Sequence, residues 1–212
     1  MRAKKLLGPL VAFALISGAA TAASAQYGGF RPNGFSLIRP RPQLIASGPM
    51  VVTPSMEWNR YPRGRYDLDR EENWTLNGPA LDGISFISGL QNNRPIVYQR
   101  RKDDRKVPNF RADMTPQEIA DMIESFYLIR GGSVSFDMTG LQPRTFMGHP
   151  GFQLDYRHLG GDEVDRQGRA VGAVINGRLY LALFDAARLH YFPAALPEFE
   201  RIVASAQLRG RR

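Results

Sequence analysis

The sequence predicts an α+β domain in which a mainly antiparallel sheet carries two principal helices packed on it. Three observations predict this fold class. Short apolar segments between turn residues indicate strands in both halves of the chain, a capped amphipathic helix lies between the two groups of strands, and a second amphipathic helix ends the chain. We expect a single α+β domain over residues 49–212, which is long enough to bury one hydrophobic core.

The apolar segments that precede the first helix are short and bounded by Pro, Gly or Asn. They predict three strands, at residues 50–53, 84–87 and 95–99. Residues 91–94 are typical of a hairpin loop between the second and the third. The charged stretch 59–73, between Trp58 and Trp74, is expected to be a loop.

The first helix has the clearest start signal in the sequence. Thr115 and Glu118 form a capping box around Pro116, in which the Thr hydroxyl accepts from the Glu amide and the Glu carboxylate accepts from the Thr amide. Apolar residues then recur at helical spacing: Ile119, Met122, Ile123, Phe126 and Tyr127. Gly131 and Gly132 supply the left-handed residue that ends such a helix. The apolar stripe favours packing against the core.

The second half predicts an antiparallel sheet followed by a helix. Its strands are expected at residues 134–136, 145–147, 152–156, 170–175 and 179–184. Asn176 and Gly177 form a two-residue hairpin signal. The segment 179–184 is apolar on both faces, so it should be a central strand covered on both sides. The closing helix is expected to begin near Leu196, with Pro197 in its first turn.

Residues 1–25 have the pattern of a cleavable secretory signal. A cationic start precedes a short apolar run, and Ala23-Ser24-Ala25 matches the small-residue cleavage site before Gln26. The apolar run is shorter than the roughly 20 residues of a membrane span. We therefore expect an exported protein, periplasmic or secreted after cleavage, with no transmembrane span in the mature chain.

Residues 26–48 are predicted to be a flexible arm rich in Gly, Pro and Arg. The full chain has a net charge of +8, and cleavage of the signal removes three cations, which leaves +5. Three of those charges, Arg31, Arg39 and Arg41, lie in the arm, which has no acidic residue. The arm is either a spacer or a weak cationic tether to an anionic surface.

The chemical inventory offers no familiar catalytic motif. The chain has no Cys, which excludes thiol nucleophiles and thiolate metal sites. Its three histidines, His149, His158 and His190, have no metal-ligand spacing, and no Ser elbow or phosphate-binding glycine motif occurs. We expect no metal and no cofactor. The acidic residues 162–165 favour a solvated hairpin turn over a calcium loop. Nucleic acid is a poor partner for an exported protein.

Four stretches of the second half resemble the PsbP-like fold: 151–156 (GFQLDY), 168–170 (GRA), 177–184 (GRLYLALF) and 197–206 (PEFERIVASA). The resemblance implies an α/β/α sandwich around an antiparallel sheet, and non-enzymatic accessory or binding roles. Residues 73–78 and 110–116 are similar to uncharacterised exported bacterial envelope proteins. The chain departs from their lipidated members because it has no Cys. These motifs mark packing and turns, so they transfer no functional residue.

The function predicted from the sequence is a non-catalytic, periplasmic or envelope-associated accessory domain that binds an envelope protein or an anionic surface. The residues expected to make contact are Trp58, Trp74, Arg100, Arg101 and Lys102. Two alternatives stay open: a domain that binds a lipid or a small metabolite, and a hydrolase that uses carboxylates and a histidine. For the hydrolase, Asp155, His158 and Asp162 lie near one expected strand end. The sequence does not indicate an oligomeric state.

Overall fold

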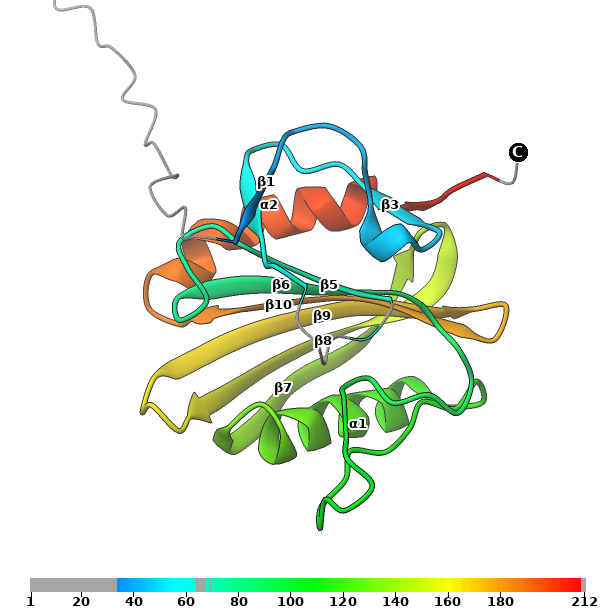
Figure 1. The fold of residues 1–212 in the computed structure, drawn as a ribbon, viewed down its shortest axis with the longest axis vertical. Coiled ribbons are helices and arrows are strands. Elements are labelled where there is room, and N and C mark those ends of the chain that lie inside the picture. The colour runs from blue at the N-terminus through cyan, green and yellow to red at the C-terminus, as the bar shows by residue number, and fades with distance from the viewer. Residues whose placement is uncertain (1–33, 64–67, 69, 211–212) are drawn as a thin grey trace, which may run out of the picture.

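An eight-stranded sheet forms the middle layer of the domain, with a helix on each of its faces (Figure 1). The computed structural model describes residues 34–63, 68 and 70–210, and all counts here refer to them. The strand order is β1-β4-β5-β6-β10-β9-β8-β7, and every neighbouring pair is antiparallel. A three-stranded sheet, β11-β3-β2, lies on the same side as α2 (Figure 1). The predicted α+β fold class is therefore confirmed.

The elements follow one another along the chain as β1 (Ser36–Ile38), β2 (Gln43–Leu44), the 3-10 turn η1 (Ile45–Ser47), β3 (Met50–Val52), β4 (Trp58–Arg60), β5 (Glu71–Thr75), β6 (Asp82–Leu90), α1 (Pro116–Ile129), β7 (Ser133–Phe146), β8 (His149–Gly160), β9 (Asp165–Ile175), β10 (Arg178–Ala187), α2 (Tyr191–Ser205) and β11 (Gln207–Leu208).

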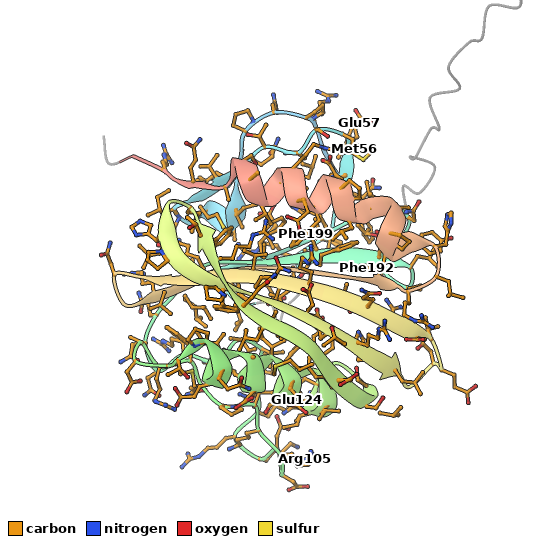
Figure 2. The ribbon with its side chains drawn as sticks, turned by 180° about the vertical axis from the view of Figure 1, so that it is seen from behind. Met56, Glu57, Arg105, Glu124, Phe192 and Phe199 are labelled. Carbon is orange, nitrogen blue, oxygen red and sulfur yellow. The ribbon has the colours of Figure 1, made fainter. Side chains whose placement is uncertain are left out.

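Strand β10 divides the hydrophobic core into two clusters. It pairs with β6 on one side and β9 on the other, as a central strand does. Because successive side chains of a strand point to opposite faces, Tyr180 and Phe184 pack towards α2, whereas Leu181 and Leu183 pack towards α1. Figure 2 shows Phe199 lying between α2 and the sheet, in the cluster that holds Phe184. The predicted central strand is confirmed.

The start of α1 follows the predicted capping box. The Glu118 amide donates to the Thr115 hydroxyl at 3.2 Å, and the Glu118 carboxylate accepts from the Thr115 amide at 2.7 Å. These bonds, that of the Thr115 amide above all, lower the pKa of Glu118. The helix ends before Gly132, which has a φ of 72° and so adopts the left-handed conformation that favours glycine.

The domain begins earlier than predicted. Residues 1–33, which include the signal sequence and the first part of the predicted arm, lie outside the described residues. Residues 34–48 are described, and they are not a flexible arm: β1 pairs with β4, and Ile38 and Ile45 are buried in the α2 cluster. The Gly, Pro and Arg content of the segment led to the prediction of a flexible arm. The segment is ordered because its few apolar residues are buried, which stabilises it.

Four predicted elements differ from the structure. Residues 95–99 form no strand and belong to the loop that leads to α1, from which Ile96 packs into the α1 cluster. The segments predicted at 134–136 and 145–147 are joined in one strand, β7, which includes Pro143 and ends at Phe146, one residue before the predicted end. A proline is tolerated there because β7 lies at the edge of the sheet. Helix α2 begins at Tyr191, so Pro197 lies inside it. Because proline has no amide proton, one backbone carbonyl in the preceding turn lacks its helical hydrogen bond. The exposed position of Pro197 leaves that carbonyl accessible to water.

Candidate functional site

The two tryptophans predicted to contact a partner are core residues. Trp58 and Trp74 are both 0% exposed and belong to the cluster under α2. Their rings lie 6.3 Å apart, and Trp74 Nε1 donates a hydrogen bond to Glu72 at 2.8 Å. Neither ring can reach a partner, so this prediction is wrong. Both residues sit on short strands of the sheet, where a large ring contributes more by filling the core than by exposure.

The basic residues predicted with them lie at the surface. Arg100, Arg101 and Lys102 are exposed in the loop that leads to α1. The carboxylate of Asp103 organises this loop, because it accepts from the Arg100 amide at 2.6 Å and forms an ion pair with Arg130. These bonds, that of the Arg100 amide above all, lower the pKa of Asp103. The three cations are consecutive and exposed, and their part in binding stays a prediction.

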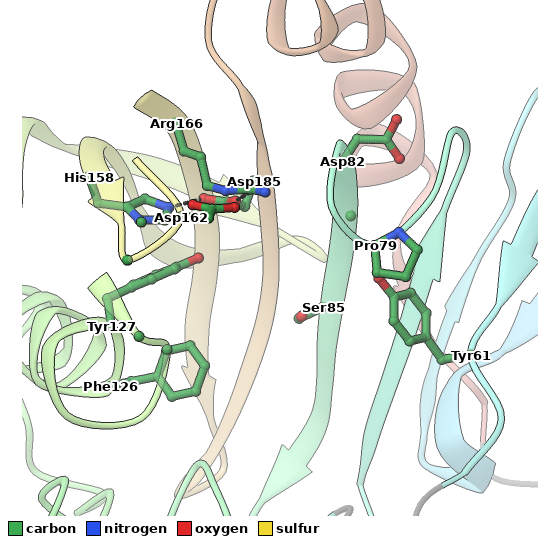
Figure 3. Close-up of a pocket in the computed structure, with 15 residues that line it drawn as sticks. Tyr61, Pro79, Asp82, Ser85, Phe126, Tyr127, His158, Asp162, Arg166 and Asp185 are labelled. Carbon is green, nitrogen blue, oxygen red and sulfur yellow. Dashed lines mark hydrogen bonds and ion pairs between the residues drawn. The ribbon is translucent and has the colours of Figure 1, made fainter. Parts of the chain in front are cut away.

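A cleft of about 500 Å³ opens where one end of the sheet meets the C-terminal end of α1 (Figure 3). It lies beside the first residues of β6 and β9 and the last residues of β8 and β10. The charged, aromatic and imidazole side chains that line it are those of Tyr61, Asp82, Phe126, Tyr127, His158, Asp162, Arg166 and Asp185. We call it the polar cleft.

A chain of hydrogen bonds crosses one wall of the polar cleft. Ser133 Oγ lies 2.8 Å from His158 Nδ1, and His158 Nε2 lies 2.6 Å from the Asp185 carboxylate. The second oxygen of that carboxylate accepts from Arg166 at 3.2 Å. The strand register produces this arrangement, because His158 and Arg166 are directly paired across β8 and β9. Both ring nitrogens of His158 therefore have internal partners.

Two tyrosine hydroxyl groups continue the polar wall into the core. Tyr127 Oη and Tyr156 Oη are 2.7 Å apart, and the Tyr127 ring lies 4.5 Å from the His158 ring. Burial raises the pKa of both tyrosines well above the usual value, and the charge of Asp185 adds to the effect. Tyr156 also covers Gly168 on the next strand, where a Cβ atom would lie 2.0 Å from its ring. The pair is therefore fixed and neutral.

The opposite wall carries Tyr61 and the buried carboxylate of Asp82 (Figure 3). Asp82 accepts hydrogen bonds from the Thr75 hydroxyl at 2.9 Å and the Leu76 amide at 2.7 Å. Burial raises the pKa of Tyr61 to about 12, and the negative charge of Asp82 acts in the same direction. The lining as a whole carries three carboxylates and one guanidinium, so the polar cleft favours positive charge.

The structure separates the three residues considered for hydrolysis. His158 and Asp162 line the polar cleft, but Asp155 does not. Because side chains alternate along β8, Asp155 lies on the α2 face, where it accepts from Arg169 at 2.6 Å. Arg169 also binds Glu200 of α2 at 2.8 Å. Asp155 is therefore part of the ion pairs that hold α2 to the sheet.

Sequence reasoning missed Tyr127, Arg166 and Asp185. Tyr127 reads as one more member of the apolar stripe of α1, and Arg166 as a charge in a turn. Asp185 had a signal, because it is the first charged residue after the apolar segment 179–184. A carboxylate that ends a central strand lies where several strand ends meet, which is a place for a binding site.

Two general features of the described residues bear on function. No three His, Asp or Glu side chains within them converge as metal ligands would. Their helices are also too short or too polar to cross a membrane.

Comparisons with known proteins identify the fold by structure and not by sequence. No protein-family model matches the chain. No curated protein matches it either. Among solved structures, CyanoP, the cyanobacterial PsbP of Synechocystis sp. PCC 6803, is similar over 85% of this chain and 96% of its own length, with a TM-score of 0.53 and 14% identity.

Two other structures are similar over comparable lengths. The protein of unknown function PA94 from Pseudomonas aeruginosa matches with a TM-score of 0.45 and 13% identity, over 84% of this chain and 98% of its own. The Ran-binding protein Mog1p of Saccharomyces cerevisiae matches with a TM-score of 0.44 and 6% identity, over 82% and 95%. The element order, the three layers and the similarity to CyanoP together show that this chain has the PsbP-like fold.

Proposed function

We propose that this chain is an exported, non-catalytic accessory protein, and that its polar cleft binds a basic side chain of a partner protein. The pattern of residues 1–25 supports export. The observation that carries the non-catalytic role is the burial of His158, whose side chain is only 4% exposed, between its partners Ser133 and Asp185.

A general base must lie within hydrogen-bond reach of the proton that it removes, and a nucleophile must reach its substrate. The His158 side chain is only 4% exposed, and Ser133, whose hydroxyl lies against it, is 8% exposed. Asp82 is 1% exposed and surrounded by donors from residues 75–77. His158 and Asp82 thus hold the shape of the polar cleft.

The polar cleft has the chemistry of a site for a cation. Its net lining charge is negative, and the rings of Tyr61, Phe126 and Tyr127 supply the aromatic faces that attract Lys or Arg. Asp162 is the exposed carboxylate of the group and lies in the turn between β8 and β9. Exposed glycines, Gly131 and Gly161 among them, leave the rim open to a side chain that arrives from solvent.

The test is titration of the ¹⁵N-labelled protein with Nα-acetyl-lysine amide and, as the matched probe, Nα-acetyl-glutamate amide. We expect the lysine probe alone to shift the rim glycine resonances in a saturable way. Asp162→Asn should weaken this binding several-fold, since a charge-assisted hydrogen bond is lost. The control Asp137→Asn removes an exposed carboxylate of β7 that does not line the cleft. Equal response to both probes would refute the proposal.

Export has its own test. The protein recovered from the periplasm or medium should begin at Gln26, as shown by N-terminal sequencing. A chain that begins at Met1 and stays in the cytoplasm would remove the export part of the proposal and leave the binding site to be judged separately.

A hydrolase is the second candidate, because Ser133, His158 and Asp185 are connected in the order of a catalytic triad. Against it, Ser133 is 8% exposed and does not line the polar cleft, whereas a nucleophile must reach its substrate. Hydrolysis of p-nitrophenyl esters, abolished by Ser133→Ala in a protein of unchanged stability, would replace the non-catalytic proposal.

A further inference from the structure

A second cleft, of about 610 Å³, lies at the other ends of β6 and β10. Three arginines line it: Arg63, Arg70 and Arg94. Leu68, Leu90 and Pro95 supply apolar surface between them. We call it the basic cleft. Its residues belong neither to the polar cleft nor to the basic loop at 100–102.

The three arginines come from separate segments. Arg63 follows β4, Arg70 precedes β5 and Arg94 follows β6. The backbone of Arg94 is held in place, because its carbonyl accepts from the Phe110 amide at 2.9 Å while its side chain is exposed. Arg70 donates to the Ser47 carbonyl at 3.2 Å. The fold thus places three guanidinium groups around one cavity.

The described lining of the basic cleft differs in charge from that of the polar cleft. None of the residues that the structure describes around the basic cleft is acidic. Within the residues that the structure describes, Arg70 and Arg94 form no ion pair, whereas eight other arginines do. Arg70 and Arg94 carry like charges that repel each other, so an anion that binds to both lowers this repulsion.

Arg178 adds to the positive potential. Burial raises the pKa of Tyr180, and the guanidinium groups of Arg178 and Arg70 oppose that rise. Both cations therefore lie within electrostatic reach of one tyrosine. Tyr180 in turn lies against Gly89, which lines the basic cleft.

The rim of the basic cleft is rigid and strained. Ala46 and Ser47 both have left-handed backbone conformations, with φ values of 47° and 54°. Such residues cost free energy and persist only where their surroundings fix them. Here the Glu72 carboxylate accepts from the Ala46 amide at 2.8 Å, and Arg70 binds the Ser47 carbonyl. The bond to Ser47 also limits how far the Arg70 guanidinium can move.

We propose that the basic cleft is a binding site for an organic phosphate, with its phosphate group on the arginines and its apolar part on Leu68, Leu90 and Pro95. The planar guanidinium fork binds phosphate oxygens in pairs, which a surface lysine cannot do. A cavity of this size accommodates a small organic molecule. The phosphate can belong to a soluble metabolite or to the head group of an anionic phospholipid.

Two arms of one experiment separate these sources. Purified protein is titrated with glycerol 3-phosphate by calorimetry at low salt, and it is sedimented with vesicles of phosphatidylglycerol or phosphatidylcholine. Arg94→Gln should weaken binding about tenfold, since one charge-assisted contact is removed. Arg157→Gln is the matched control, because it removes an equal charge from an exposed position of β8 outside both clefts.

The outcomes are distinct. Binding of either ligand that Arg94→Gln weakens and Arg157→Gln does not would support the site, and the arm that responds identifies the source. The thermal midpoint of each variant confirms that the protein is folded. Binding that both substitutions reduce equally would be attraction by net charge alone and would overturn the proposal, as would the absence of binding in both arms. Neither result depends on the polar cleft, so the two proposals can fail independently.

Discussion

The polar cleft and the basic cleft lie at opposite ends of β6 and β10 and use charge in opposite ways. In the polar cleft, Asp185 is bonded to both His158 and Arg166. In the basic cleft, the described lining has arginines and no acidic side chain. The sheet between them is continuous, so the contrast comes from the residues at the strand ends and not from different folds.

The difference separates two uses of a charged side chain. Opposite charges that bind each other in a half-buried place fix the shape of the protein, and removing one partner leaves the other desolvated. Like charges that gather at a cavity contribute little to stability and are suited to a ligand. Substitutions of the paired groups of the polar cleft should therefore change mainly the free energy of unfolding, and substitutions in the basic cleft mainly affinity.

The largest effect is expected for Asp185→Asn. The substitution leaves Arg166 and His158, which are mostly buried, without their carboxylate. We expect a loss of about 2–4 kcal/mol in the free energy of unfolding, measured by urea denaturation. Asp162→Asn in the same cleft is the control, because that side chain is exposed, and it should change stability by less than about 0.5 kcal/mol. Equal effects would remove the distinction between paired and exposed charge.

The tyrosine pair should give a smaller loss. Tyr127→Phe and Tyr156→Phe each leave one buried hydroxyl without the partner it has at 2.7 Å, at a cost of about 1–2 kcal/mol. The double variant should lose less than the sum, because no hydroxyl is then left unpaired. A double-mutant cycle in urea measures the coupling, and strict additivity would contradict it.

The same pair predicts sensitivity to alkaline conditions. Burial holds the pKa of Tyr127 and Tyr156 well above the value of about 10 in an unfolded chain. Stability from this source is complete below pH 10 and declines as the pH rises above it, because only the unfolded chain loses the protons readily. The urea midpoint should fall as the pH is raised above 10. The fall should be smaller in the double Phe variant, and an equal fall would assign it to other groups.

The smallest effect on stability is expected for Arg94→Gln. Its exposed side chain has no ion pair in the described part of the chain, so the free energy of unfolding should stay within about 0.5 kcal/mol of the parent. A loss above about 1 kcal/mol would show that the basic cleft is also held by its charges. The comparison between the two clefts would then no longer stand.

Local signals predicted much of the fold. The capping box of Thr115 and Glu118, the hairpin at Asn176 and Gly177, and the doubly apolar strand β10 each involve residues that are neighbours in sequence. Such patterns act within a few residues, so they can be recognised without knowledge of the rest of the chain. The wrong predictions concern segments whose state depends on distant contacts. Residues 95–99 have the composition of a strand but form part of an irregular loop, from which Ile96 packs into the α1 cluster.

The candidate sites were less predictable for the same reason. The polar cleft joins Tyr61, Tyr127 and Asp185, which come from three different parts of the chain. No spacing rule connects them, because the strand order β6-β10-β9-β8 brings them together only in the folded sheet. The tryptophans show the reverse case: their chemistry suits a contact surface, and only the fold decides that they are buried.

The edge strand β7 has a consequence for the behaviour of the protein at high concentration. An exposed strand edge is a template on which another chain can add, which leads to aggregation. Pro143 lacks the amide proton that such an addition would use, and the ladder with β8 is irregular near Ser133 and Gly140. Val134, 66% exposed, is an apolar side chain that β7 presents to solvent. The proline and the bulges thus disfavour the addition of a second chain to that edge, even when the protein is concentrated.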